Sequence, residues 1–415
     1  MTGKICIVTS HFPPQRSAVG DYALRLSEAL VNSGAQVCVL TSIASGEEAF
    51  REGIRVSAVS NGWGIRGVWQ VIKILRHERP QVVNLQYVPQ MYNRYGINLL
   101  IALLPCAIRC MLNVPVITTC HEFVGGSPRA LKAAVLQICY AAQILLILLG
   151  SRRVVVPVER HIEILETYYR RLARRARLIP VGSNIPVCGV QREKSVGDNA
   201  SRQENWTIAT LGTGHPWWNY ELALRTVFQL RETGYNIHLR CIGDIEGANP
   251  SYFARLQTLS DELDLNGCVT WTGYCAAEEV SAFLSAADIF FFTQITGPTM
   301  RSTALMAALA HGLPVVSTRG VDTDQYLLES GAIMFVPADA PEQAAAEIDR
   351  LFRDAQLRHE WADKAQELYE TKFSWSKIAA QYNEIFLDIT KHGAATPEPK
   401  QKNAFHHEGH EGKKI

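Results

Sequence analysis

Two short segments carry the side chains best suited to bind and polarise a reacting group. His121 and Glu122 close the strand-like run VPVITTC, and Arg301 stands in GPTMRST (297–303) before a predicted helix. A histidine at a strand end can hydrogen-bond a hydroxyl group or a departing anion, unless the backbone already satisfies it. An arginine fork binds phosphate in a bidentate manner, unless it is only a surface charge. We therefore take His121 and Arg301 as the candidate catalytic residues.

A larger set of glycines, hydroxyls and other polar residues follows predicted strands in the second half of the chain. Free N–H groups and hydroxyls at a helix start suit an anion. Ser302 and Thr303 could instead only cap a helix, as could Asp244. Trp217 and Trp218 could stack on a ring or pack in the core. The candidate binding residues here are Gly212, Thr213, Gly214, His215, Asp244, Tyr274, Thr299, Met300, Ser302 and Thr303.

A second set lies in the first half of the chain. Gly20 stands at the start of a helix after the first strand, where a glycine lets an anion approach the helix N-terminus. The alternative is a plain strand-to-helix turn. The candidates in this half are Gly20, Asp21, Tyr22, Gln86 and Glu122.

Composition limits the classes to which the protein can belong. The chain has 415 residues, with 41 Lys and Arg against 40 Asp and Glu, so a nucleic-acid binder that relies on bulk positive charge is excluded. Ten scattered cysteines without a CxxC pair argue against a disulfide scaffold or a zinc site. The sequence has no signal-peptide pattern, so we expect a cytoplasmic protein. The histidines near the C-terminus could bind a metal only incidentally.

Residues 133–151 form a run of 19 residues without a charge, barely long enough to span a bilayer. Strand-like runs at 114–119 and 152–158 flank it, and a span would separate two strands of one sheet. We therefore predict a buried or membrane-resting helix. The following stretch, 152–177, has eight arginines against three glutamates. Such a stretch suits an anionic membrane surface, to which the protein would be peripheral, or is simply a solvated helix face.

Short β-branched runs alternate with helix-length amphipathic runs, which is typical of parallel α/β sheets. The predicted strands fall into two series, which predicts two doubly wound Rossmann-like domains that face a cleft. We expect these domains at 1–186 and 206–372, with a linker at 187–205, a helix at 373–391 that packs back on the first domain, and a disordered tail at 392–415. The expected strands are 4–10, 35–42, 54–59, 80–86, 114–119, 152–158, 176–181, 206–212, 236–244, 268–273, 288–293, 314–318 and 332–337.

The common nucleotide and nucleophile fingerprints of α/β proteins do not fit. In neither predicted domain does the first strand lead into G-x-G-x-x-G, and the chain contains no GxxxxGK[ST] and no GxSxG. The sequence thus disfavours a dinucleotide-dependent enzyme, a P-loop enzyme and an α/β-hydrolase.

The order of several segments resembles the GT-B glycosyltransferases, specifically the family 4 (group 1) enzymes, over about residues 4–390. The segments that carry the resemblance are 13–41, VVNLQY (82–87), ITTCHEF (117–123), RLIPVGSNIP (177–186), TGYCAAEEVSAFLSAADIFFF (272–292), ALAHGLPVVST (308–318) and FSWSKIAAQY (373–382).

The resemblance implies a nucleotide-sugar donor, UDP- or GDP-linked, in the second domain and an acceptor in the first. It also implies retention of configuration, with no cofactor and usually no metal. The acceptor would be a glycan, a lipid-linked molecule or another small molecule. On this basis the residues of the second half are expected to bind the donor, and those of the first half the acceptor.

The donor side departs from the family pattern. The usual E-x7-E acids fall on Thr299 and Ala307, and the usual Arg and Lys after the first strand of this domain are absent. Losing two charged hydrogen bonds would weaken binding by about two to four decades. GPTMRST reads as a rebuilt phosphate site. The alternatives are a catalytically silent protein that binds a nucleotide, glycan or partner enzyme, and a nucleotide-sugar epimerase.

Overall fold

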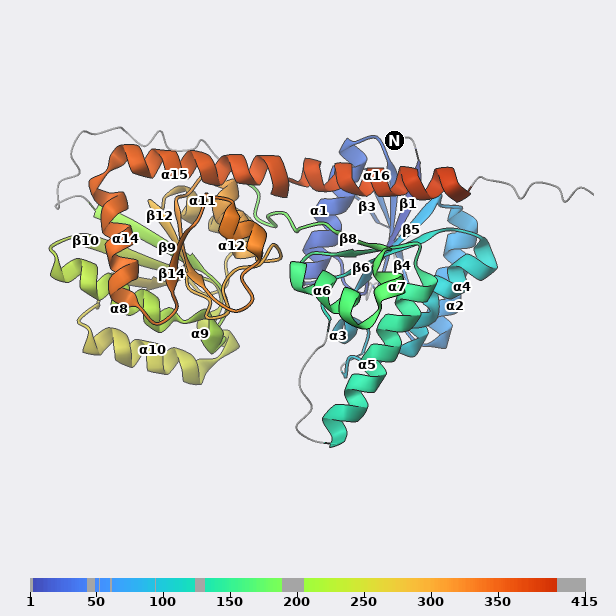
Figure 1. Ribbon diagram of the computed structural model, residues 1–415, viewed down its shortest axis with the longest axis horizontal. Coiled ribbons are helices and arrows are strands. Elements are labelled where there is room, and N and C mark those ends of the chain that lie inside the picture. The colour runs from blue at the N-terminus through green and yellow to red at the C-terminus, as the bar shows by residue number, and fades with distance from the viewer. Residues whose placement is uncertain are drawn as a thin grey trace, which may run out of the picture.

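The computed structural model describes residues 3–42, 49–51, 53–59, 62–93, 95–123, 131–188 and 205–393. Most of the expected linker and of the expected tail therefore lies outside the described residues. The chain folds into two α/β units, each built on one predominantly parallel sheet (Figure 1). The predicted two-sheet GT-B architecture is confirmed.

The first sheet has eight strands in the order β3-β4-β2-β1-β5-β6-β7-β8, parallel except for the short edge strand β3. β3 is absent from the sequence prediction. The strands are β1 (Lys4–Val8), β2 (Gln36–Thr41), β3 (Ala49–Arg51), β4 (Ile54–Ala58), β5 (Val82–Tyr87), β6 (Val116–Cys120), β7 (Arg153–Val156) and β8 (Ala176–Leu178). Its helices are α1 (Ala18–Asn32), α2 (Ile65–Glu78), α3 (Pro89–Tyr92), α4 (Leu99–Leu112), α5 (Leu131–Gly150), α6 (Glu159–Tyr168) and α7 (Arg170–Ala173).

The second sheet has six parallel strands in the order β11-β10-β9-β12-β13-β14. They are β9 (Asn205–Leu211), β10 (Asn236–Ile242), β11 (Val269–Trp271), β12 (Ile289–Phe292), β13 (Val315–Arg319) and β14 (Met334–Pro337). The helices are η1 (Pro216–Trp218), α8 (Tyr220–Glu232), α9 (Ile245–Ala248), α10 (Pro250–Glu262), α11 (Ala277–Ser285), α12 (Thr303–Ala310), α13 (Gln325–Glu329), α14 (Pro341–Arg353), α15 (Ala355–Leu368), η2 (Tyr369–Phe373) and α16 (Trp375–Gly393).

Burial on both faces explains why the central strands read as continuous apolar runs. Every residue of β5, β6 and β12 is buried, because helices cover both sides of each sheet. β1 and β2 follow the same pattern apart from their first residues. The hydrophobic effect of these runs fixes which sequence segments form the centre of each unit.

The C-terminal helix joins the two units. α15 lies on the second unit, and α16 continues from it across the first unit (Figure 1). Tyr382 on α16 is fully buried, and its hydroxyl lies 3.0 Å from that of Tyr22 on α1. The core of the first unit is therefore completed by α16, a helix that comes after the second unit in the sequence.

Candidate functional site

The two sheets place the ends of their strands where a ligand would bind. Both sheets have the doubly wound strand order. The chain first adds strands on one side of the first strand and then on its other side, so the order switches between β1 and β5 and between β9 and β12. In such sheets ligands bind outside the carboxyl ends at this switch point. The loops there include 9–17, 212–219 and 293–302, so the two sets of candidate residues face each other from different units.

Arg301 links the two units at this point. Its Nη1 donates to the main-chain oxygen of His121 at 2.7 Å and lies 3.4 Å from Glu122 Oε1. The side chains of Arg301 and Glu122 are 40% and 47% exposed. No partner for Arg301 Nε or Nη2 exists among the described residues, so most of the guanidinium fork remains available to a ligand.

His121 is held as a neutral ring. Its Nε2 lies 2.7 Å from Gln86 Oε1, which can only accept, so Nε2 carries the proton. Nδ1 is left as an acceptor, and it has no protein partner within the described ranges. Burial, and then the positive charge of Arg301, lowers the pKa of His121 to about 3. His121 is therefore a hydrogen-bonding group at neutral pH and not a cation.

A buried chain of polar side chains runs from His121 to the C-terminal helix. Gln86 Nε2 donates to Asn84 Oδ1, and Asn84 Nδ2 donates to Thr119 Oγ1 at 3.0 Å. Thr119 Oγ1 lies 2.7 Å from the hydroxyl of Tyr382. These members satisfy one another away from water, which fixes the orientation of each amide and hydroxyl. Gln86 was predicted to contact the acceptor, but it is fully buried and orients His121 instead.

The loop before α12 is tied to the first unit through its backbone. Met300 donates its N–H to Asp324 Oδ2 at 2.6 Å, and its oxygen accepts from the N–H of Val181 at 3.0 Å. The Met300 side chain has no exposed surface. Neither its backbone nor its side chain is free for a ligand, so its assignment to the donor site is wrong.

The glycines after β9 serve close packing of the backbone. A Cβ on Gly212 would lie 2.5 Å from the ring of Trp218, and one on Gly214 would lie 2.2 Å from the oxygen of Ile245. Thr213 and His215, by contrast, are exposed in this loop. Only these two of the four predicted residues present side chains to the cleft.

Asp244 and the tryptophans have structural contacts. Asp244 Oδ1 accepts from Gly247 N at 2.9 Å and caps α9, as the alternative interpretation proposed. Trp218 packs edge-on against Phe292 in the core, with ring centroids 5.5 Å apart. Trp217 is half exposed and lies against the ring of His215 at 3.9 Å. Of these side chains, Trp217 and His215 remain open to a ligand.

The turn before α12 is stabilised by its own hydroxyls. Ser302 Oγ accepts from the N–H of Thr299 at 2.9 Å, and Thr299 Oγ1 accepts from the N–H of Arg301 at 3.3 Å. Ser302 occupies the N-cap position of α12 but makes no side-chain cap bond. Thr299, Ser302 and Thr303 are all partly exposed. This turn therefore presents hydroxyl groups beside the Arg301 guanidinium.

Tyr274 reaches the loop after β1. Its ring is 59% exposed, and the guanidinium carbon of Arg16 lies 3.8 Å from the ring centroid. This cation–π contact joins the two units at a second place. Arg16 is a cleft residue that the sequence analysis missed, because nothing in the sequence shows which side chain faces Tyr274.

The three candidate residues near the start of α1, Gly20, Asp21 and Tyr22, differ in exposure. Tyr22 is 3% exposed and lies edge-on to the His121 ring at 4.7 Å, so it is a core residue and not an acceptor contact. A Cβ on Gly20 would lie 3.2 Å from the oxygen of His11, so the glycine lets the backbone of the loop after β1 pack closely against α1. Burial raises the pKa of the partly exposed Asp21. Asp21 alone of the three offers a side chain to the cleft.

Comparison with known families identifies this arrangement. Residues 191–368 match the family model "Glycosyl transferases group 1", and residues 19–185 match "Glycosyltransferase Family 4". The chain belongs to the group 1, family 4 glycosyltransferases of GT-B fold. The first matched segment covers β2 to β8 of the first sheet, and the second covers all six strands of the second sheet.

Individual relatives of this glycosyltransferase-family chain are distant. The lipopolysaccharide core biosynthesis glycosyltransferase LpsE of Rhizobium meliloti is 25% identical over 149 residues, which cover 36% of this chain and 41% of LpsE. The matched segments span half or less of the length of the curated relatives. Sequence similarity therefore supports the family more strongly than any one activity.

Solved structures agree over nearly the whole chain. Sucrose-phosphate synthase from Thermosynechococcus elongatus superposes with a TM-score of 0.68 at 16% identity, covering 94% of this chain and 100% of that one. Anabaena HepE, solved in complex with UDP, gives 0.64 at 14% identity, covering 93% and 100%. At these identities the likeness establishes the GT-B fold.

His161 is a further residue of this GT-B cleft that the sequence analysis missed. It lies in the first turn of α6, is 8% exposed, and its ring lies edge-on to Phe123 at 4.7 Å. Burial, followed by the charge of Arg301, lowers its pKa to about 3. Its Nδ1 is buried and has no hydrogen-bond partner among the described residues. Within the part of the chain that the structure describes, no three His, Cys, Asp or Glu side chains gather as a metal would require.

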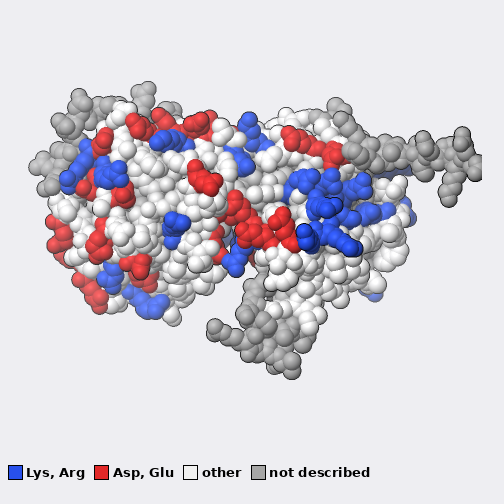
Figure 2. Space-filling model, viewed as in Figure 1, with Lys and Arg blue, Asp and Glu red and all other residues white. Residues whose placement is uncertain are grey.

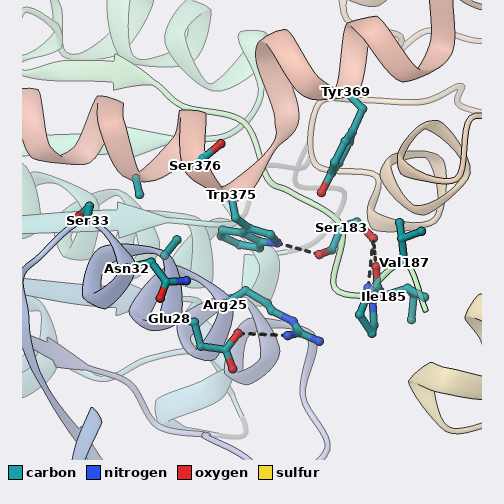
Figure 3. A pocket seen from close by; sticks show the side chains of 13 residues that line it. Arg25, Glu28, Asn32, Ser33, Ser183, Ile185, Val187, Tyr369, Trp375 and Ser376 are labelled. Atoms are coloured by element: carbon teal, nitrogen blue, oxygen red, sulfur yellow. Dashed lines mark hydrogen bonds and ion pairs between the residues drawn. The ribbon is translucent and has the colours of Figure 1, made fainter. Parts of the chain in front are cut away.

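A cavity of about 370 Å³ lies where the two chain connections between the units meet, and not in the predicted cleft. Figure 3 shows it between α1, the segment around Ser183 and the start of α16. Trp375 Nε1 donates to the oxygen of Ser183 at 2.7 Å, so the two chain crossings between the units touch each other here. Arg25 and Glu28 form an ion pair on its wall. None of the candidate donor or acceptor residues lines this cavity.

The uncharged run predicted to be a helix is α5. Neither α5 nor any other helix among the described residues has both the length and the apolar character needed to cross a bilayer. Gln143 and Ile147 on α5 are buried, whereas Ile138, Leu145 and Leu149 are exposed. The helix therefore has one face on the domain and one face without a protein partner among the described residues.

Proposed function

We propose that this protein transfers a sugar from a UDP- or GDP-linked donor to a glycan, lipid-linked or other small acceptor, with retention. The observation that carries the proposal is the position of Arg301. It projects from the second unit to the carboxyl end of β6 in the first, within hydrogen-bonding distance of His121 O. A cation at this place is suited to hold a diphosphate between the two units.

The donor diphosphate would bind the free edge of the Arg301 guanidinium. Two parallel N–H···O bonds from Nε and Nη2 match a phosphate. The hydroxyls of Thr299, Ser302 and Thr303 and the exposed Thr213 and His215 would complete the site. UDP in the structure of HepE, a protein of the same fold, supports a nucleotide donor.

The neutral His121 ring suits contact with an uncharged sugar. Its Nδ1 can accept from a sugar hydroxyl, while Gln86 holds Nε2–H. Charge developing on the departing diphosphate would be stabilised by Arg301, and preorganised stabilisation of this kind is often the largest catalytic contribution. The leaving phosphate would take the acceptor proton, so no further general base is required.

The acceptor side of the cleft would be formed by Asp21, Glu122 and the loop after β1. The name of LpsE refers to lipopolysaccharide core biosynthesis, which supports a glycan acceptor and a role in polysaccharide assembly. The exposed apolar face of α5 and the arginines of 152–177 would rest on an anionic membrane surface. The protein would then act on the membrane as a peripheral enzyme.

Thermal unfolding in the presence of UDP, GDP and their sugars tests the donor site. A ligand that binds only the folded state raises the unfolding temperature. We expect a rise with one of the two nucleotides, lost in Arg301→Ala and retained in Arg225→Ala, which removes an exposed arginine from α8. Equal rises in the parent and Arg301→Ala would refute this donor site.

The two family acids are replaced here by Thr299 and Ala307. Their absence favours a second candidate function, that of a catalytically silent protein that binds a nucleotide or glycan. Ala307, at the position of the second acid, is fully buried in α12 and can contact no ribose. Release of nucleoside diphosphate from a nucleotide sugar, with a sugar-bearing acceptor as product, distinguishes the two. Nucleotide binding without any such release over a panel of glycan and lipid-linked acceptors would favour the silent protein.

A further inference from the structure

The outer faces of α4 and α5 form one exposed apolar surface. On α4, Leu103 and Met111 are 42% and 43% exposed, and on α5, Ile138 and Leu149 are 69% and 47% exposed. The two helices pack against each other. Contiguous apolar surface of this kind marks a place where a protein meets a partner or a membrane. We call it the α4–α5 face.

Arginines gather beside this face. Figure 2 shows a cluster of basic side chains on the first unit, below α16 and over α7. Apart from Arg160, which pairs with Asp322, the exposed arginines of the stretch after α5, together with the arginine of α4, are Arg109, Arg152, Arg170, Arg171, Arg174 and Arg177. Apolar surface bordered by arginines is complementary to an anionic bilayer, whose headgroups carry the opposite charge.

A cavity of about 350 Å³ lies at the border between the apolar and basic surfaces. Arg109, Cys110 and Asn113 line it from the end of α4, and Arg152 lines it from the start of β7. A smaller cavity of about 120 Å³ adjoins it at Arg152 and holds the Arg153–Asp388 ion pair. Among the described residues, no acidic side chain lines the larger cavity, which we call the α4–β7 pocket.

Two arginines near the pocket are fixed by the end of α5. Arg109 Nη1 donates to the oxygens of Leu149 and Gly150 at 3.2 and 3.1 Å. Arg175 Nη1 donates to the oxygens of Leu148 and Ser151 at 2.8 and 3.2 Å. These bonds use the free carbonyls of a helix C-terminus, where a cation is favoured. They also place Arg109 directly beside the exposed Leu149.

The positive charges of this cluster oppose one another. Burial lowers the pKa of Arg175, and repulsion from Arg109, Arg152 and Arg153 lowers it further. The Arg152 guanidinium has no hydrogen-bond or ionic partner among the described residues. Asp388, which pairs with Arg153, is the acidic side chain at the adjoining cavity. An anion between Arg109 and Arg152 would relieve this repulsion.

We propose that the α4–β7 pocket binds the phosphate group of an anionic phospholipid while the α4–α5 face lies on the bilayer. This inference rests on the membrane surface in the proposed function, but it does not depend on donor binding or sugar transfer. The phosphate would accept from Arg152 and from the remaining donors of Arg109, and the acyl chains would extend along Met111 and Leu149.

Co-sedimentation of the full chain with vesicles tests the pocket. We expect binding to phosphatidylcholine vesicles that contain a minority of phosphatidylglycerol, and much weaker binding to phosphatidylcholine alone. Arg152→Ala removes both a charge and a hydrogen-bonding partner, so it should weaken binding about tenfold or more. Arg170→Ala removes an equal charge outside the pocket, so we expect a loss of about fivefold.

Three results would overturn the proposal. Equal losses in Arg152→Ala and Arg170→Ala would mean that the charge acts without a pocket. Equal binding to both kinds of vesicle would mean that the apolar face acts alone. A rise in unfolding temperature with inorganic phosphate, abolished by Arg152→Ala and without vesicle binding, would assign the pocket to a soluble anion. Arg152→Ala should leave nucleotide-induced stabilisation unchanged, so failure of the donor site and failure of the pocket are distinguishable.

Discussion

Glu159 and Asp324 form a reciprocal exchange across the two units, in which the carboxylate of each accepts from a backbone N–H at the start of the other's helix. Asp324 Oδ1 accepts from the main-chain N–H of Glu159 at 3.1 Å, and Glu159 Oε2 accepts from the N–H of Gln325, the first residue of α13, at 2.7 Å. The start of α6 and the start of α13 thus cap each other. Because Asp324 also accepts from Met300, this exchange positions the loop that carries Arg301.

Asp324 should make stability depend on pH. Burial is the largest effect and raises its pKa from 3.8 to about 6. The folded protein then binds this proton more tightly than the unfolded chain, so the stabilising contribution is present at low pH and is lost as the pH rises to about 6. We expect the free energy of unfolding of the parent, relative to Asp324→Asn, to fall from pH 4 to about 6 and then level off. Urea unfolding at several pH values measures it, and a difference that grows with pH would contradict this.

Replacing Arg301 should separate the contribution of its positive charge to nucleotide binding from that of its planar guanidinium. Arg301→Gln removes the charge and should weaken binding of the nucleoside diphosphate by about ten- to a hundredfold, the loss expected for a charged hydrogen bond. Arg301→Lys keeps a point charge without the planar fork and should fall between the parent and Arg301→Gln. Isothermal titration calorimetry gives the three dissociation constants. Identical constants for Lys and Arg would show that the fork is not used.

Gln86 should act through the orientation of His121. Gln86→Leu leaves His121 Nε2–H without its acceptor, so the ring can turn and Nδ1 is no longer fixed. We expect slower sugar transfer with nearly unchanged affinity for the nucleotide. Steady-state kinetics together with calorimetry separate the two effects. Gln257→Leu, at an exposed position of α10, is the control; an unchanged turnover in Gln86→Leu would show that His121 needs no positioning.

The hydroxyl of Tyr382 should contribute to folding. It lies 2.7 Å from Thr119 Oγ1 and 3.0 Å from the hydroxyl of Tyr22, and all three are buried. Tyr382→Phe removes this partner from the buried Tyr22 hydroxyl and leaves Thr119 Oγ1 bonded only to Asn84, so we expect a loss of about 1–3 kcal/mol in the free energy of unfolding. Tyr168→Phe, which alters a 75% exposed ring, should change little. Equal stability of the two variants in urea would be inconsistent with a cooperative network.

Arg16 and Tyr274 should be coupled energetically. A cation over an exposed aromatic ring contributes about 0.5–1 kcal/mol. A double-mutant cycle with Arg16→Ala, Tyr274→Ala and the double variant isolates this coupling from the separate effect of each truncation. Urea unfolding supplies the four free energies. A coupling energy of zero would mean that the contact does not hold the loop after β1 to the second unit.

The predicted strands and helices agree with the structure because their signals are local. Continuous apolar runs such as ICIV and IFFF are buried on both faces, and each predicted strand overlaps an observed one. The short edge strand β3 escaped prediction because its three residues carry no periodicity. The alternation of the two element types is enough to predict two doubly wound sheets, and therefore which loops lie at the carboxyl ends of the strands.

The role of each polar residue at those strand ends could not be predicted in the same way. Gln86 and His121 both end strands, yet one is enclosed as a positioning residue and the other keeps a ring nitrogen available. Met300 and Arg301 are neighbours in sequence, yet one is fully buried and the other is 40% exposed. Orientation of this kind depends on what packs against the strand end from elsewhere in the chain.

The sequence by itself thus determined the family and the two sheets, and it placed the candidates His121 and Arg301 at the carboxyl ends of strands, because periodicity and residue type are local properties. Only the tertiary structure decided that Asp324 and Glu159 cap each other's helices, that Arg16 meets Tyr274, and that Arg152 faces a pocket with Arg109. These contacts join residues far apart in the chain. Hydrogen bonds and charges act through distance in space, which the order of residues does not specify.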